Sequence, residues 1–136
     1  MSGTAPAPGG LVRGVGIDAV DIARLRRALD RRPRLAERVF TEAERAYASG
    51  ATDPGPRLAA RFAAKEAVAK ALGAGIGAVS WHQVEVVRDD RGAPTLSLSG
   101  AAAALAAQRG IERWHLSLTH TDTLAVASVV AEGGRP

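Results

Sequence analysis

The sequence predicts an α+β fold, with helices and paired strands segregated along the chain rather than alternating as in a parallel sheet. Runs of strand length that are rich in branched apolar residues stand near both ends, whereas alanine-rich segments with helical spacing fill much of the middle. The 136 residues are enough for one hydrophobic core. We expect a single domain over residues 11–132, a disordered tail over 1–10 and a short C-terminal tail over 133–136.

The first strand is expected at residues 11–18 (LVRGVGID), a run of branched apolar residues that ends in an acidic residue. A basic amphipathic helix is expected over 21–32, and Asp21 can cap its first turn. Apolar residues recur there at helical spacing, namely Ile22, Leu25 and Leu29. Arginines occupy much of the remaining surface of this helix.

Pro33 ends that pattern, and a second, short helix is expected over 35–40. Thr41 is followed three residues later by Glu44, which is the spacing of a capping box. This local signal predicts the start of a third helix over 41–48.

The most regular helical pattern is the alanine-rich run 57–72, which follows a loop over 49–56. Gly73 and Gly75 end this helix, since glycine readily adopts the backbone conformation that terminates a helix. This long helix is expected to form the centre of the fold.

The last third of the chain shows two pairs of short apolar runs, each pair interrupted by a polar turn, at 89–92 and 121–123. An alanine-rich run lies between the pairs. The expected elements are strands at 84–87 and 95–98, a helix at 100–109, and strands at 115–119 and 124–130.

The composition excludes several function classes. Without cysteine the chain has no disulfide, thiolate metal ligand or Cys nucleophile, which fits a reducing compartment. The N-terminal stretch lacks the apolar run of a signal peptide, and charges interrupt every stretch long enough for a membrane helix, so we expect a cytoplasmic protein. Lys and Arg (18) exceed Asp and Glu (14), giving a charge of +4 that favours an acidic partner. Aromatic residues are only 4% of the chain, which argues against single-stranded nucleic acid.

The segment 14–19 (GVGIDA) matches the dinucleotide-binding fingerprint, but Asp18 would place a carboxylate beside the pyrophosphate. Two anions in contact are unfavourable unless a cation lies between them. A divalent metal bound by Asp18 would remove this repulsion and could hold the pyrophosphate for a reaction. The alternative is an Asp in an ordinary turn.

The segment 61–70 surrounds one carboxylate, Glu66, with cations. Glu66 and Lys70 are four residues apart, so a solvated salt bridge on the helix surface is the simplest interpretation. The density of positive charge contributed by Arg61, Lys65 and Lys70 nevertheless suits a phosphate ester together with a metal.

The segment 117–122 (SLTHTD) ends the next-to-last expected strand in a hydroxyl-rich turn. A Ser/His/Asp triad is disfavoured because the residues are too close in sequence and no nucleophile-elbow motif is present. His120 and Thr121 fit better as hydrogen-bond donors to phosphate. His82 and His115 lack zinc-ligand spacing and are expected to be structural.

Taken together, the motifs at 14–18, 61–70 and 117–121 resemble those of the 4'-phosphopantetheinyl transferases, in particular their small trimeric group, the holo-acyl-carrier-protein synthases. The likeness spans about residues 12–132. It implies a single domain with an antiparallel sheet packed on a long helix. It also implies magnesium-dependent transfer of the 4'-phosphopantetheine of coenzyme A to a serine of apo acyl carrier protein, with release of adenosine 3',5'-bisphosphate.

The resemblance assigns roles to individual residues. Asp18 and Glu66 match the two metal-binding carboxylates of the family, and Lys70 matches a lysine near the transferred phosphate. The serine proton could pass to a metal-bound water or to a ligating carboxylate such as Glu66, and the sequence leaves this open. The remaining expected coenzyme-binding residues are Arg61 and Lys65, which could instead serve the fold, and Gly73, His120 and Thr121.

The resemblance further implies a homotrimer with active sites between subunits, working in fatty-acid or polyketide synthesis. The arginines of the basic helix and its continuation match a surface that docks the acidic carrier protein. These residues are Arg24, Arg27, Arg31, Arg34 and Arg38. Two departures stand out: Val20 replaces a third metal carboxylate found in some relatives, and the loop 49–56 has no basic residue for the coenzyme phosphates. The competing hypothesis is a non-enzymatic basic module that binds nucleic acid.

Overall fold

The computed structural model describes residues 10–75 and 79–134. The elements in chain order are β1 (Leu11–Asp21), α1 (Ile22–Arg31), α2 (Leu35–Val39), α3 (Glu42–Ser49), α4 (Gly55–Ala71), the 3-10 helix η1 (Trp81–Gln83), β2 (Val84–Arg88), β3 (Pro94–Leu98), α5 (Gly100–Gln108), β4 (Arg113–His120) and β5 (Leu124–Gly133). Of the expected N-terminal tail only Gly10 is described. Of the expected C-terminal tail Gly133 and Gly134 are described, and Gly133 is the last residue of β5, one residue past the expected end of the domain at 132.

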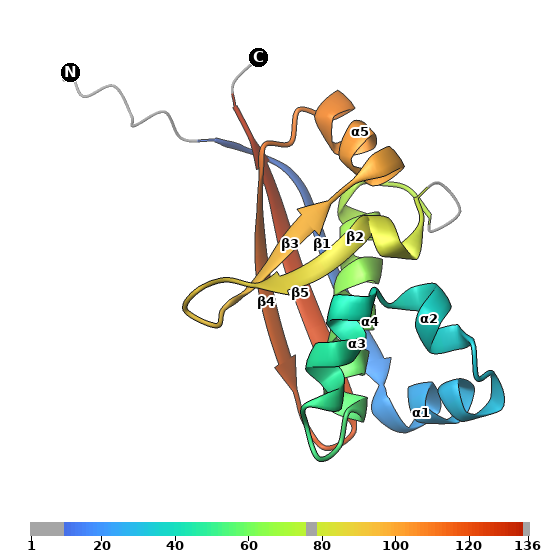
Figure 1. Cartoon of the computed structure of the whole chain (residues 1–136). Coiled ribbons are helices and arrows are strands. Elements are labelled where there is room, and N and C mark those ends of the chain that lie inside the picture. The colour runs from blue at the N-terminus through green and yellow to red at the C-terminus, as the bar shows by residue number, and fades with distance from the viewer. Residues whose placement is uncertain (1–9, 76–78, 135–136) are drawn as a thin grey trace, which may run out of the picture.

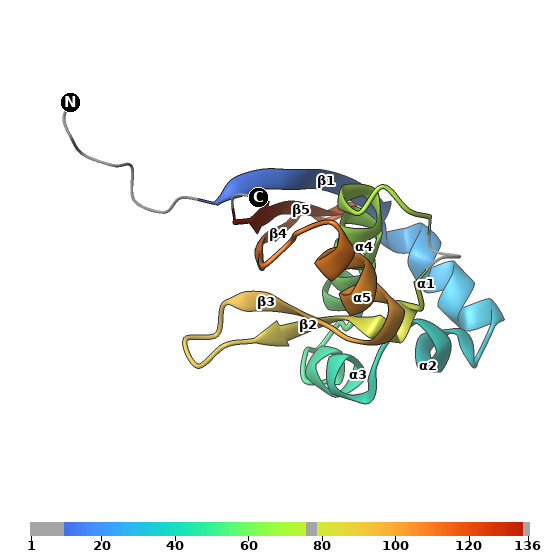
Figure 2. The same cartoon turned by 90° about the horizontal axis from the view of Figure 1, so that it is seen from above.

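Three long strands form an antiparallel sheet in the order β1-β5-β4, and β2 and β3 form a separate hairpin (Figure 1). Helix α4 lies between the sheet and this hairpin, as the view from above shows (Figure 2). The α+β class and the long helix packed on an antiparallel sheet are therefore confirmed.

Helix α4 packs closely on β1 because glycine and alanine meet at the contact. A Cβ atom added at Gly16 would overlap the carbonyl oxygen of Ala67, and one added at Gly14 would overlap that of Ala71. Both alanines are buried in the main core. The two glycines of the dinucleotide-like motif thus serve helix-on-strand packing, so the backbone of α4 occupies the side of β1 that they leave open.

Local start signals are confirmed atom by atom. The Asp21 side chain accepts a hydrogen bond from the backbone N–H of Arg24 at the start of α1. At the start of α3 the Thr41 hydroxyl accepts from the N–H of Glu44, and the Glu44 carboxylate accepts from the N–H of Thr41. Gly73 follows α4 with a positive φ of 68°, which only glycine adopts readily.

The expected elements need correction at five places, namely β1, β4, β5, α4 and η1. The first strand extends three residues beyond 18, because residues 19–21 continue to pair with β5. Strand β4 starts at Arg113, which pairs with Glu132 of β5, and β5 reaches Gly133, which pairs with Leu11 of β1. Helix α4 begins at Gly55, with Pro56 in its first turn, where proline is tolerated. The short helix η1 was not expected.

Within residues 10–75 and 79–134, no helix has the length and apolar character needed to span a membrane.

Candidate active site

The tertiary structure brings together three predicted site residues, Asp18, Glu66 and Lys70. Asp18 points from the α4-facing side of β1, and Glu66 and Lys70 lie one helical turn apart on α4. The ammonium of Lys70 lies 2.9 Å from Oδ1 of Asp18 and donates a second hydrogen bond, of 2.9 Å, to the carbonyl of Ile17. The predicted Glu66–Lys70 salt bridge is not formed, because Lys70 pairs with Asp18 instead.

The electrostatics of Glu66 reflect this arrangement. Partial burial raises the pKa of the Glu66 carboxyl above its ordinary value, and the neighbouring Asp18 carboxylate raises it further, while Lys70 acts in the opposite direction. Two close carboxylates that share one lysine retain unfavourable repulsion when both are ionised. A further cation beside them would relieve it.

The carboxylate pair fits a divalent cation such as Mg²⁺. Carboxylate oxygens are the hard ligands that Mg²⁺ prefers, and Mg²⁺ is commonly held by one or two carboxylates together with water and substrate phosphate oxygens. Among the described residues no group of three or more His, Cys, Asp or Glu could hold a metal. With Asp18 and Glu66 as protein ligands, the remaining positions around such an ion would be open to substrate oxygens and water.

Asp18 and Glu66 line one end of a cavity of about 750 Å³ between the end of β1 and helices α1, α2 and α4. Its wall is mainly apolar, contributed by Leu25, Ala28, Leu29, Leu35, Val39, Phe40, Phe62 and Trp81. The rings of Phe62 and Trp81 stack with centroids 5.1 Å apart. Arg24 and Arg38 also line the cavity. Trp81 was missed by the sequence analysis, since a lone tryptophan outside a periodic pattern carries no local signal.

Lys65 requires a correction. The sequence analysis placed it among coenzyme-binding residues, yet its side chain is fully buried. Its ammonium lies 2.7 Å from Oε1 of Glu44 and donates to the carbonyls of Trp81 (3.0 Å) and Val84 (2.6 Å). Burial lowers the pKa of Lys65, and the Glu44 carboxylate opposes that shift. With all three N–H groups used inside the protein, Lys65 has none left for a ligand.

Arg61 also points away from the carboxylate pair. It is 5% exposed and packs on the ring of Tyr47, with its guanidinium carbon 4.2 Å from the ring centroid. Arg57 and Arg88 contact the same ring, and none of the three arginines forms an ion pair with another described residue. Burial lowers the pKa of Arg61. In one chain, Arg61 thus belongs to a cation–π cluster rather than to the cavity.

The remaining predicted coenzyme-binding residues are exposed and lie outside this cavity. Gly73 lies just past the end of α4. His120 ends β4, and the Thr121 hydroxyl accepts hydrogen bonds from the backbone N–H groups of Thr123 and Leu124 in the β4–β5 turn. A single chain therefore holds the carboxylate pair and the His120–Thr121 turn as separate groups. Ser117, His120 and Asp122 form no mutual hydrogen bond among the described residues.

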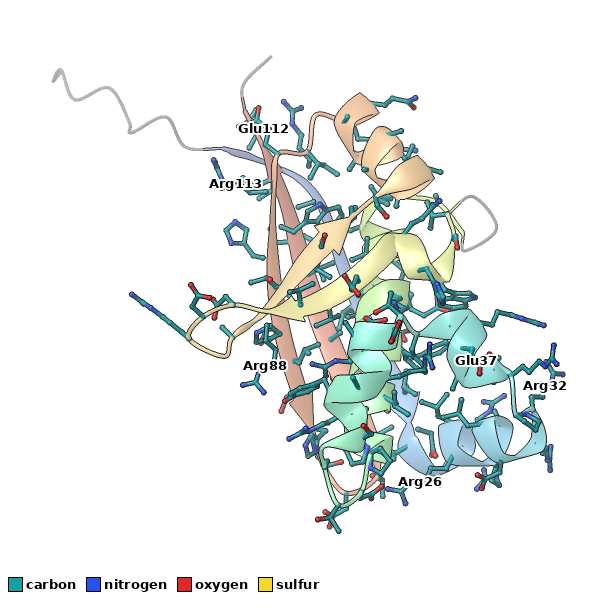
Figure 3. All side chains as sticks on the ribbon, in the orientation of Figure 1. Arg26, Arg32, Glu37, Arg88, Glu112 and Arg113 are labelled. Atoms are coloured by element: carbon teal, nitrogen blue, oxygen red, sulfur yellow. The ribbon has the colours of Figure 1, made fainter. Side chains whose placement is uncertain are left out.

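The expected docking arginines form an exposed basic surface on α1 and α2. Arg24, Arg27, Arg31, Arg34 and Arg38 are all exposed. None of them pairs with a carboxylate among the described residues, whereas Arg26 pairs with Asp53. Figure 3 shows Arg32 at the far end of α1 and Arg26 beside the loop that precedes α4. Five unpaired cations on one side of the molecule leave a large positive charge for a partner to neutralise.

The face of the sheet that α4 does not cover is apolar along β1. Val15 is 64% exposed and Ile17 62% exposed. On β5, the partly exposed Val130 lies opposite Val15, and the exposed Ser128 lies opposite Ile17. Exposed apolar residues of this size along one strand are typical of an interaction surface.

Comparisons with known proteins identify the family. Residues 14–127 match the family model of the 4'-phosphopantetheinyl transferase superfamily. The holo-[acyl-carrier-protein] synthase of Salinispora arenicola is 57% identical over 122 residues, covering 90% of this chain and 99% of the relative. The crystal structure of the holo-[acyl-carrier-protein] synthase from Neisseria meningitidis superposes with a TM-score of 0.82 at 36% identity, covering 90% of this chain and 99% of that one.

A synthase from Bacillus anthracis, whose crystal structure is a complex with CoA (3',5'-ADP), has a TM-score of 0.75 and 39% identity, and the match covers 90% of this chain and 98% of that one. The family match covers most of the chain, and the relatives are matched over nearly their whole length. The carboxylate pair on β1 and α4, and the sequence and structural matches that include it, lead to one conclusion: this chain belongs to the 4'-phosphopantetheinyl transferase superfamily.

Proposed function

We propose that this chain is a holo-acyl-carrier-protein synthase that transfers the 4'-phosphopantetheine of coenzyme A to a serine of apo acyl carrier protein in a magnesium-dependent reaction. The observation that carries the proposal is the position of Asp18 and Glu66, adjacent to each other and to Lys70 at the end of a large cavity. Hard oxygen ligands beside a lysine suit a pyrophosphate-linked donor.

In the proposed reaction the serine hydroxyl oxygen attacks the phosphorus next to the pantetheine arm. The new P–O bond forms to serine, the bond to the bridging pyrophosphate oxygen breaks, and its electron pair leaves with adenosine 3',5'-bisphosphate. Asp18 and Glu66 would hold magnesium, which when bound supplies positive charge to the pyrophosphate oxygens and helps orient the phosphorus for in-line attack. Lys70 stabilises charge on the transferred phosphoryl group, and its bond to the Ile17 carbonyl fixes its position.

The serine proton needs an acceptor. Its candidate acceptors are a carboxylate oxygen of Glu66 and a water molecule beside it, and one of these takes the proton as the serine oxygen bonds to phosphorus. Phe62 and Trp81 exclude bulk water from the wall of the cavity, which strengthens these electrostatic interactions.

The carrier protein docks on the exposed arginines of α1 and α2. Acyl carrier proteins are acidic, so they would complement this surface. The unpaired guanidinium groups of Arg24 and Arg38 also line the cavity that the serine must enter. Charge complementarity of this kind mainly raises the association rate and orients the partner.

The active enzyme is a homotrimer assembled through the apolar face of the sheet. Two observations support this: the exposed strip at Val15 and Ile17, and the separation of His120 and Thr121 from the carboxylate pair within one chain. Assembly would cover the strip and bring the His120–Thr121 turn of one copy toward the carboxylates of another. Coenzyme A would then bind between two copies.

Intact-mass spectrometry of apo acyl carrier protein, incubated with this protein and coenzyme A, tests the proposal. A phosphopantetheine-sized mass gain that requires Mg²⁺ and is lost with chelator is the expected result. If no carrier gains mass in Mg²⁺ while the protein binds DNA with a steep salt dependence, the nucleic-acid-binding alternative replaces this one.

A further inference from the structure

The fully buried pair of Lys65 and Glu44 leaves no polar atom unused. The Lys65 ammonium contacts Oε1 of Glu44 and the carbonyls of Trp81 and Val84. On the other side, Oε1 of Glu44 accepts the N–H of Thr41 at 2.9 Å and Oε2 accepts the N–H of Val86 at 2.9 Å. One ion pair thus joins α3, α4, η1 and β2.

Stability alone is a weak reason to bury two charges. The loss of hydration is expensive, and replacing a buried ion pair with apolar residues is often neutral or stabilising. An apolar pair would not supply directional bonds. The three N–H groups of Lys65 meet three acceptors, and these bonds hold α4 in one rotation and η1 in one position. The pair is therefore better explained by placement than by stability.

The elements that this pair holds also build the candidate active site. Lys65 precedes Glu66 on α4, and successive residues of a helix point about 100° apart. Anchoring Lys65 in the core therefore turns Glu66 toward the cavity. The Trp81 carbonyl is held by Lys65, while the Trp81 ring stacks on Phe62, and both rings line the cavity beside Glu66.

We propose that Lys65, locked by Glu44, is a positioning residue for the transfer reaction: it sets the rotation of α4 that presents Glu66 and holds the Trp81 wall of the cavity. This inference rests on the proposed function for its kinetic readout. It assigns no contact with coenzyme A to Lys65, in contrast to the sequence-based expectation.

The surroundings give the pair a fixed polarity. Carbonyl oxygens surround the ammonium, and backbone N–H groups surround the carboxylate. Reversing the charges with Glu44→Lys and Lys65→Glu would set each charge against groups of the wrong polarity. The reversed pair is therefore expected not to restore activity.

The test compares Glu44→Gln/Lys65→Met, which removes both charges together, with the wild type. Single substitutions leave one charge buried and uncompensated, so the double variant is the one expected to fold. Glu44→Asp serves as a milder second variant, because it keeps the charge and shortens the side chain by one methylene. Glu42→Asp, at an exposed position on the same helix, is its matched control. Ile111→Ala, at the far end of the core, controls for lost stability.

Expected results are a fall in kcat/KM of about 10- to 100-fold for the double variant, a smaller fall for Glu44→Asp, and none for Glu42→Asp. With Trp114 replaced by phenylalanine, Trp81 is the only tryptophan. Its fluorescence should shift to longer wavelength in the double variant, because the indole becomes more exposed to water. This spectroscopic readout does not depend on activity, so it still tests the placement of Trp81 if the wild type shows no transfer.

Two outcomes would overturn the proposal. In the first, the folded double variant matches Ile111→Ala in melting temperature, kcat/KM and Trp81 emission, so the pair is purely structural. In the second, the double variant raises the KM for coenzyme A while Glu44→Asp does not and Trp81 emission is unchanged in both, so Lys65 contacts the coenzyme itself.

Discussion

The ammonium of Lys70 lies 2.9 Å from Oδ1 of Asp18, although the two residues are 52 positions apart in the chain. The lysine reaches from α4 to β1, and Asp18 is in turn close enough to Glu66 to raise the pKa of the Glu66 carboxyl. One cation thus lies beside two carboxylates.

Removing either carboxylate should abolish transfer without unfolding the protein. Asp18→Asn and Glu66→Gln keep the size of each side chain but remove a hard anionic ligand, so loss of metal binding should lower kcat/KM by more than about 100-fold. Mass analysis of the carrier protein measures the loss, and circular dichroism checks the fold. Wild-type rates in either variant would rule out this pair as the metal site.

The same Glu66→Gln variant should be more stable than the wild type when no metal is added. A carboxyl whose pKa is raised in the folded state destabilises that state as pH rises through the raised value, and the cost remains at neutral pH. The neutral amide removes this cost, so the melting temperature at pH 7 should rise by roughly 1–3 °C. Added Mg²⁺ should raise the melting temperature of the wild type and not that of Glu66→Gln. Equal melting temperatures for both proteins under every condition would contradict the electrostatic description of Glu66.

Replacing Lys70 with methionine should change both the rate and its pH dependence. Lys70 lowers the pKa of Glu66, so its removal raises that pKa further, and Glu66 then ionises only at higher pH. We expect kcat to fall about 10- to 100-fold and the acid limb of kcat/KM to move to higher pH. A rate–pH profile of Lys70→Met measures both effects. A shift of the acid limb toward lower pH would show that Lys70 does not act on Glu66.

Reversing charge on the basic surface should weaken recognition of the carrier protein and not of coenzyme A. Arg31→Glu and Arg34→Glu are each expected to raise the KM for the carrier about two- to tenfold, with a smaller effect at high salt. Arg91→Glu, in the exposed turn of the β2–β3 hairpin, is the matched control. Steady-state kinetics at two salt concentrations provide the measurement. An equal rise in the KM for the carrier in Arg91→Glu would mean that the net charge of the protein, and not the surface on α1 and α2, controls recognition.

A charge on the uncovered face of the sheet should dissociate the proposed trimer. Val15→Glu places a carboxylate in the apolar strip, where burial between copies would be costly, so we expect monomers with little transfer activity. Light scattering coupled to size exclusion gives the mass of the assembly. Val87→Glu, at an exposed apolar position on β2, should leave the mass unchanged. A wild-type protein that is already monomeric and active would refute assembly through this face.

Much of the local structure was predictable from sequence, because its causes lie within a few residues. The Asp21 cap, the Thr41–Glu44 capping box and the end of α4 at Gly73 each depend on hydrogen bonds or backbone angles spanning three or four positions. Strand lengths were underestimated, since β1, β4 and β5 end where their partners end rather than where their own apolar runs stop.

By itself the sequence determined the caps, the α+β class and the residue types able to hold a metal at positions 18 and 66. The sequence could not show that Lys65 and Lys70 have different roles, because both lie on one helix in similar alanine-rich surroundings. Tertiary packing decided between them: Lys65 faces α3 and β2 and is fully buried, whereas the Lys70 side chain is 55% exposed beside β1. The physical reason is that helical periodicity specifies the angle between two side chains, while only the elements packed around the helix decide which angle meets solvent, a carboxylate or the core.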